Sequence, residues 1–111
     1  MLFAILTLIT EGGHFKGKKL AVYNVSGEID PNATGNYFYD GSYNGKPSYS
    51  NFLEGIMLFY IGWDNVSRWY ISPIKGASAG YNWYRISPDI LGLYTHGGTA
   101  LGDATVAAGL Q

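Results

Sequence analysis

The chain has 111 residues, enough for one domain with a single core, and it is 47% apolar but only 14% charged, which excludes a disordered polymer. A formal net charge of −1, with seven Lys and Arg, gives no electrostatic basis for binding nucleic acid apart from the short cluster Lys16-Gly17-Lys18-Lys19. Because there is no cysteine, disulfides, thiolate metal sites and cysteine nucleophiles are excluded as well.

The first predicted element is an apolar run at residues 2–9, which is typical of a strand buried on both faces. The run is too short to span a bilayer, and it lacks the basic start and the small-residue cleavage site of a signal peptide. We therefore expect 1–19 to be an apolar strand or docking arm, with a cleaved signal as the alternative, and 20–111 to be a β module. The docking side chains of the arm would be Phe3, Ile5 and Leu8.

Strand formers and turn formers alternate through the next thirty or so residues. Strands are predicted at 20–25 and 36–40, with a loop at 30–35 that is dense in Asp, Pro, Asn and Gly. A break at 41–42 ends the second strand. Asn44-Gly45 then predicts a tight hairpin, because both residue types tolerate the positive φ of a type I′ turn.

Two aromatic runs, at 56–63 and 68–72, predict the hairpin around which we expect the domain to be built. The polar residues 64–67 between them form its turn. Trp63 and Trp69 flank this turn and are predicted to meet across the two strands, where an aromatic pair contributes about 0.5 to 1.5 kcal/mol beyond its area burial.

Three further strands are predicted at 81–86, 91–95 and 104–107, with a Gly-rich loop at 96–103. Turn signals recur about every 8 to 12 residues, which is the pattern of a sandwich or barrel. We therefore expect an all-β, small single-domain β-sandwich or barrel of about seven to nine short antiparallel strands.

Catalytic and metal-binding residues are sparse. The two histidines, His14 and His96, each lie beside glycine in a predicted loop. A hydrolase that pairs His96 with Asp89 or Asp103 is the enzymatic alternative. The aspartates mostly neighbour turn residues, and no run matches a calcium loop. We expect no enzyme activity, no metal and no cofactor.

Ten Tyr and three Trp provide the candidate binding residues, because these side chains are enriched where a ring is partly buried and partly in contact with a partner. An aromatic residue at alternate strand positions is nevertheless more often in the core. Neighbours on a strand point to opposite faces, so one member of an adjacent pair of rings is expected to be partly exposed. The candidates for a protein interface or for stacking on a saccharide are Trp63, Trp69, Trp83, Tyr43, Tyr49 and Tyr84.

Several short motifs follow one another in order across residues 20–109. The most specific piece is Tyr43-Asn44-Gly45-Lys46-Pro47 with Tyr49, followed about twenty residues later by Trp69-Tyr70-Ile71-Ser72, and the order continues to Gly102-Asp103-Ala104-Thr105-Val106. In order and spacing these motifs resemble a small β module that recurs in bacteriophage virion proteins. The chain departs from the usual module in two respects. The module is usually appended to a larger protein, whereas here it makes up nearly the whole chain, and the turn at 64–67 lacks the expected Gly.

The resemblance implies a non-enzymatic structural or attachment role, as in phage tail, fibre and capsid-surface proteins. We expect a capsid decoration or cement protein, or a tail-surface component, that binds the major capsid or tail protein. A homo-oligomer is expected, with a trimer favoured, located in the virion and assembled in the cytoplasm of the host bacterium. A module that binds host-surface glycan is the alternative, and neither nucleic acid nor a membrane is an expected partner.

Overall fold

Strand and turn segments alternate along the whole of the described chain, residues 21–53 and 57–109 of the computed structural model. The predicted first strand and the docking residues Phe3, Ile5 and Leu8 lie outside these residues. In the two described ranges, no helix is long and apolar enough to cross a membrane. The strands are β2 (Tyr23–Ser26), β3 (Gly35–Tyr43), β4 (Lys46–Ser50), β5 (Tyr60–Trp63), β6 (Arg68–Ser72), β7 (Tyr81–Ile86), β8 (Gly92–Gly98) and β9 (Ala104–Ala108).

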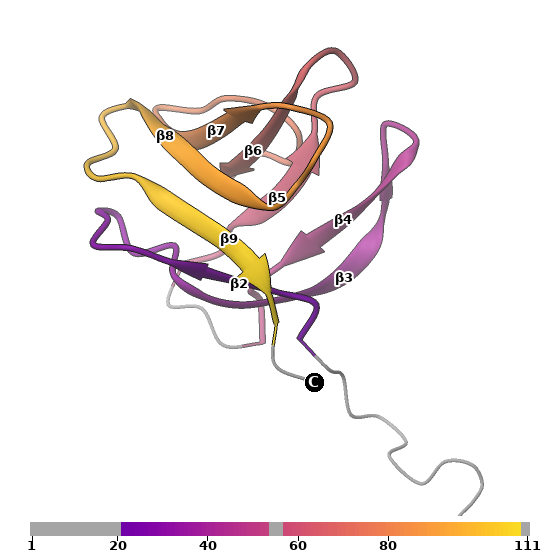
Figure 1. Ribbon diagram of the computed structural model, residues 1–111, viewed down its shortest axis with the longest axis horizontal. Helices are drawn as coiled ribbons and strands as arrows, with labels where there is room; N and C mark the ends of the chain where they lie inside the picture. The colour runs from indigo at the N-terminus through magenta and orange to yellow at the C-terminus, as the bar shows by residue number, and fades with distance from the viewer. Residues whose placement is uncertain (1–20, 54–56, 110–111) are drawn as a thin grey trace, which may run out of the picture.

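The strands form a closed antiparallel barrel in which each strand pairs with the next one in the chain (Figure 1). Pairing of β2 with β9 closes the ring, with Val25 opposite Val106. An up-and-down barrel of this kind needs only short connections between antiparallel neighbours. The predicted all-β class is therefore confirmed, and of the two expected architectures the barrel is the one formed.

Both predicted hairpin turns form, and each obtains its positive φ from the residues available. Asn44 and Gly45 have φ values of 54° and 80°, as a type I′ turn requires. In the β5–β6 turn, Asn65 has a φ of 69° and so takes the place of the missing Gly. Asp64 Oδ1 accepts hydrogen bonds from the backbone N–H groups of Val66, Ser67 and Arg68, at 2.8, 2.9 and 3.0 Å.

Strand register places one continuous row of side chains inside the barrel, because residues directly opposite each other in an antiparallel pair point to the same face. The row runs across β4 to β7 and consists of Tyr49, Ile61, Ile71 and Trp83, all of them buried. Trp63 lies opposite Trp69 on the same face, with ring centroids 5.5 Å apart. The predicted tryptophan pair is therefore confirmed.

The polar atoms of four core rings donate hydrogen bonds to backbone carbonyls of the connecting loops. These bonds are Tyr37 Oη to Ala33 O and Tyr94 Oη to Ile90 O, both 2.7 Å, Trp69 Nε1 to Pro88 O, 3.0 Å, and Trp83 Nε1 to Gly102 O, 2.8 Å. Burial raises the pKa of Tyr37 and that of Tyr94 far above the usual tyrosine value, so both hydroxyls remain donors. The rings thus fill the core and fix the loops to it.

Several predicted strand ends are wrong. Strand β3 continues through 41–42, where a bulge puts Asp40 and Gly41 opposite Ser48, and Gly41 absorbs the distortion with a φ of 87°. Strand β8 includes the predicted loop residues 96–98. Gly97 allows this, because a Cβ at that position would lie 2.8 Å from Oδ1 of the paired Asn82. In the β5–β6 hairpin, strand β5 begins at Tyr60, whereas the predicted strand begins at residue 56.

Candidate functional site

A second row of side chains crosses the outer face of the barrel. It consists of Phe38, Ser50, Tyr60 and Ser72, which lie directly opposite one another in β3, β4, β5 and β6. Ser50 follows the inward-facing Tyr49, so the two side chains point to opposite faces of the sheet. Side chains and loops cover this outer row closely enough that Ser50 and Ser72 are buried although they point away from the core.

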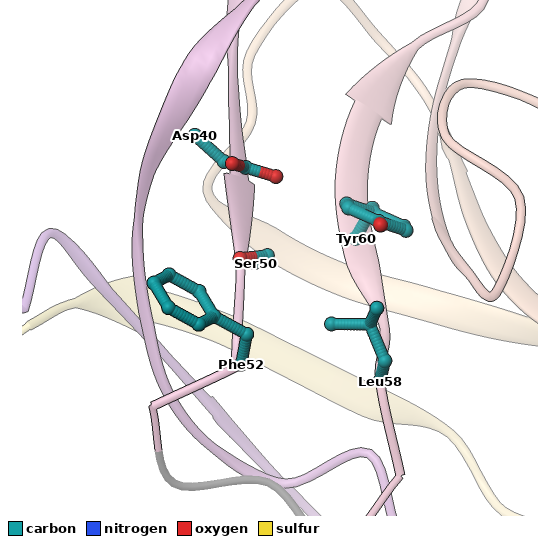
Figure 2. A pocket seen from close by; sticks show the side chains of 5 residues that line it. All are labelled: Asp40, Ser50, Phe52, Leu58 and Tyr60. Atoms are coloured by element: carbon teal, nitrogen blue, oxygen red, sulfur yellow. The ribbon is translucent and has the colours of Figure 1, made fainter.

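Part of this outer face is hollowed into a pocket of about 250 Å³, lined by Asp40, Ser50, Phe52, Leu58 and Tyr60 (Figure 2). Figure 2 shows Asp40, Ser50 and Phe52 along one side of the pocket and Tyr60 and Leu58 along the other. The bulge in β3 supplies Asp40, the end of β4 supplies Ser50, and the β4–β5 connection supplies Phe52 and Leu58. The pocket therefore combines apolar walls with a carboxylate and two hydroxyls.

The hydroxyl of Ser50 is the unusual group in this pocket. Ser50 is 1% exposed, and its Oγ makes no hydrogen bond within the described part of the chain. The neighbouring buried serines are bonded: Ser48 Oγ donates to Asp40 O and to Gly41 O, and Ser72 Oγ accepts from the N–H of Ile74. A buried hydroxyl without a partner costs about 1 to 3 kcal/mol of stability, so its retention at a pocket needs an explanation.

Lys75 lies beside the pocket and contacts two of the residues that line it. Its Nζ lies 3.5 Å from Asp40 Oδ2, donates to Asp40 O at 3.2 Å, and is 5.0 Å from the ring centroid of Tyr60. The β6–β7 loop reaches this position by crossing β5 at Gly62, where a Cβ would lie 2.7 Å from the backbone N of Gly76. Asp40 and Lys75 carry opposite charges, so the site has no net charge.

A second hollow, of about 340 Å³, lies where the β5–β6 and β7–β8 turns meet. It is lined by Trp63, Val66, Ser67, Ile86, Ser87 and Pro88. Val66 is 81% exposed and Ile86 is 64% exposed, so its walls present apolar carbon to solvent. This surface can bind another apolar surface, but it carries no charged side chain that would orient a small ligand.

Three of the six predicted aromatic candidates lie in the core. Trp83, Trp69 and Tyr49 are 0%, 4% and 9% exposed, so none of them has a free ring face for a saccharide or for a partner protein. Their assignment as interface or stacking residues is corrected accordingly. Strand alternation shows which of these side chains share a face of the sheet. It does not show which of the two faces the closed barrel buries.

The other three aromatic candidates reach the surface. Tyr43 is exposed, with its ring against Gly76, and Trp63 is half-buried beneath Nζ of Lys46, 5.2 Å from its ring centroid. Tyr84 is half-buried, and the guanidinium of Arg68 lies 4.7 Å from its ring centroid. Tyr84 thus faces outward where its neighbour in the sequence faces inward, as predicted from strand geometry.

His96 and Asp103 do come together, at the surface of the barrel. His96 Nδ1 and Asp103 Oδ1 share a hydrogen bond of 2.7 Å, and both side chains are about half exposed. This hydrogen bond lowers the pKa of Asp103. Asp89 takes no part, because its Oδ1 caps the turn at Leu91 N. In the described ranges, no group of three or more His, Cys, Asp or Glu is placed to hold a metal.

The outer pocket was missed by sequence reasoning, which chose aromatic residues of the predicted strands. A usable signal was Asp40 beside Gly41 inside an aromatic strand, because bulges occur preferentially next to functional sites. Fold and surface together define a small antiparallel barrel with a ring-filled core, a mixed polar and apolar pocket, and exposed apolar side chains. Comparisons with protein-family models, with curated proteins and with solved structures found no match for the chain.

Proposed function

We propose that the protein is a non-enzymatic structural protein of a bacteriophage particle that binds neighbouring virion proteins through the outer surface of its barrel. The observation that carries the proposal is the set of large apolar side chains left in contact with water. A fold alone implies no function, so the argument depends on this surface and on the motif order of the sequence.

The exposed apolar residues gather most densely at the connection between β4 and β5. Phe52, Leu53, Met57 and Leu58 are each between 39% and 52% exposed. Fully burying such a side chain is worth about 1.5 to 3 kcal/mol, so covering these four half-exposed groups would contribute roughly 3 to 6 kcal/mol to association. Contiguous exposed apolar patches mark protein or membrane interaction sites and ligand-binding grooves.

A second apolar surface lies at the turns around Val66 and Ile86. Two separate patches suit a subunit that contacts both a second copy of itself and a different protein. A decoration or tail-surface protein, assembled as a homo-oligomer on a capsid or tail lattice, makes such contacts. The phage context itself rests on the resemblance of the motifs at 43–49, 68–72 and 102–106.

The proposal is tested by measuring the mass of the chain in solution by light scattering and by identifying it in purified particles by mass spectrometry. We expect an oligomer in solution and a fixed number of copies per particle. Leu58→Asp should weaken assembly without unfolding the barrel, because Leu58 is already half exposed. Leu93→Asp is the matched control, because Leu93 is 57% exposed on the outer side of β8 and belongs to neither of the two patches. A soluble monomer that is absent from purified particles would overturn the proposal.

A further inference from the structure

The buried hydroxyl of Ser50, which lines the outer pocket, points to a bound ligand. Ser50 is 99% covered, borders the pocket, and finds no hydrogen-bond partner among the described residues, whereas both neighbouring buried serines do. Buried polar groups in folded proteins are nearly always bonded, so each exception calls for an explanation, such as a functional role or a bound water or ion. A ligand with a hydroxyl would supply the missing bond.

The charges around the pocket select against an ionic ligand. A cation would be drawn to Asp40, but Lys75 already occupies that role, with its ammonium 3.5 Å from the carboxylate. An anion would meet the same carboxylate at the rim of the pocket. A neutral ligand that donates hydroxyls can use the remaining lone pairs of Asp40 without separating the ion pair.

The apolar walls and the size of the pocket narrow the ligand further. Phe52, which is 52% exposed, and Leu58, which is 47% exposed, present carbon surface on opposite sides of the pocket (Figure 2). A sugar ring has both a C–H face for such walls and hydroxyls for the polar groups. At about 250 Å³ the pocket is smaller than the roughly 300 to 1,000 Å³ of sites for drug-sized molecules, so it suits one ring.

We infer that this pocket binds one neutral sugar ring, with Ser50 and Asp40 bonding its hydroxyls and Phe52 and Leu58 packing against its C–H groups. The inference goes beyond the proposed structural role and does not depend on it. It also uses none of the tryptophans, so tryptophan fluorescence would not detect the ligand.

The test uses the full chain and the methyl glycosides of glucose, galactose, mannose and N-acetylglucosamine as probes. Saturation-transfer NMR should detect at least one of them at millimolar concentration, and calorimetry should give its Kd. Ser50→Ala should weaken this Kd by about three- to tenfold, the effect of one lost hydrogen bond. Phe52→Ala should weaken it by a similar factor, and its folding is secure because the ring is half exposed. Val66→Ala, which trims an exposed side chain in the other hollow, should leave the Kd unchanged.

Two results would overturn the inference. The first is that no probe binds the wild-type chain. The second is that Ser50→Ala and Phe52→Ala bind the sugar as tightly as the wild-type chain does. If these variants impair self-association or particle binding while no probe binds, the pocket belongs to a protein interface and the sugar assignment is wrong. Sugar binding by a chain that is absent from particles would instead overturn the structural role and leave this inference standing.

Discussion

Replacing Ser50 by Ala should make the protein more stable, in contrast to the same replacement at its neighbour Ser48. The two serines lie on the same strand and are both buried, but Ser48 Oγ donates to the carbonyls of Asp40 and Gly41, whereas Ser50 Oγ finds no partner in residues 21–53 and 57–109. Ser50→Ala removes a desolvated hydroxyl that costs about 1 to 3 kcal/mol. Ser48→Ala removes a working hydrogen bond and leaves the bulge carbonyls short of a donor.

The size of each effect follows from these terms. Deleting one oxygen atom leaves a cavity worth only a few tenths of a kcal/mol, so Ser50→Ala should raise the free energy of unfolding by about 1 to 2 kcal/mol. For a domain of this size, this corresponds to a rise in Tm of roughly 4 to 8 °C. Ser48→Ala should lower the free energy of unfolding by about 1 to 2 kcal/mol.

Urea titration and thermal melts followed by circular dichroism would measure both variants against the wild-type chain. The decisive quantity is the difference in sign between the two substitutions, because both change the same residue type on the same strand. If Ser50→Ala lowers stability as much as Ser48→Ala does, then the Ser50 hydroxyl has a partner in the free protein. The reasoning that assigns the hydroxyl to a ligand would then be refuted.

Further predictions concern the β5–β6 hairpin and the surface pair on β8. Asp64→Ala should cost about 1 to 2 kcal/mol in urea melts, because its carboxylate accepts three turn N–H groups, and Asp64→Asn should cost less. Desolvation acts to raise the pKa of Asp64, but these N–H groups lower it overall. The contribution of the Asp64 carboxylate to stability should therefore be full above about pH 4 and should disappear as the pH falls through the lowered pKa. Asp64→Asn should abolish this pH dependence. A double-mutant cycle of Trp63→Ala and Trp69→Ala should give a coupling of about 0.5 to 1.5 kcal/mol, and a coupling near zero would show that the ring contact adds nothing to burial. His96→Ala should raise the pKa of Asp103 toward its usual value in an NMR titration, and an unchanged pKa would contradict the assigned hydrogen bond.

Features that depend on local chemistry were predictable from the sequence. The Asn44-Gly45 turn follows from the φ preferences of those residues, and the strand at 81–86 matches β7 residue for residue. The Trp63–Trp69 contact follows from a short turn with one ring on each side. Each of these features needs only a few neighbouring residues, so tertiary packing did not override the prediction.

Features that depend on distant residues were not predictable. Asp40 and Tyr60 share a pocket only because β4 pairs with both of their strands, at a register that a bulge shifts. The burial of Trp83 depends on which face of the sheet the closed barrel encloses. The alternation of side chains along the strand is compatible with burial of either face. His96 was expected in a loop because it neighbours glycine, but Gly97 serves instead to let β8 approach Asn82.

Closure of the barrel also limits how copies of this chain can associate. Because β2 pairs with β9, each strand of the barrel has a hydrogen-bonded neighbour on both sides. No strand from β2 to β9 is therefore an edge strand, the kind that another chain extends in fibril growth, although each side of β3 is paired along only part of its length. Contacts between copies held close together are therefore made mainly by side chains.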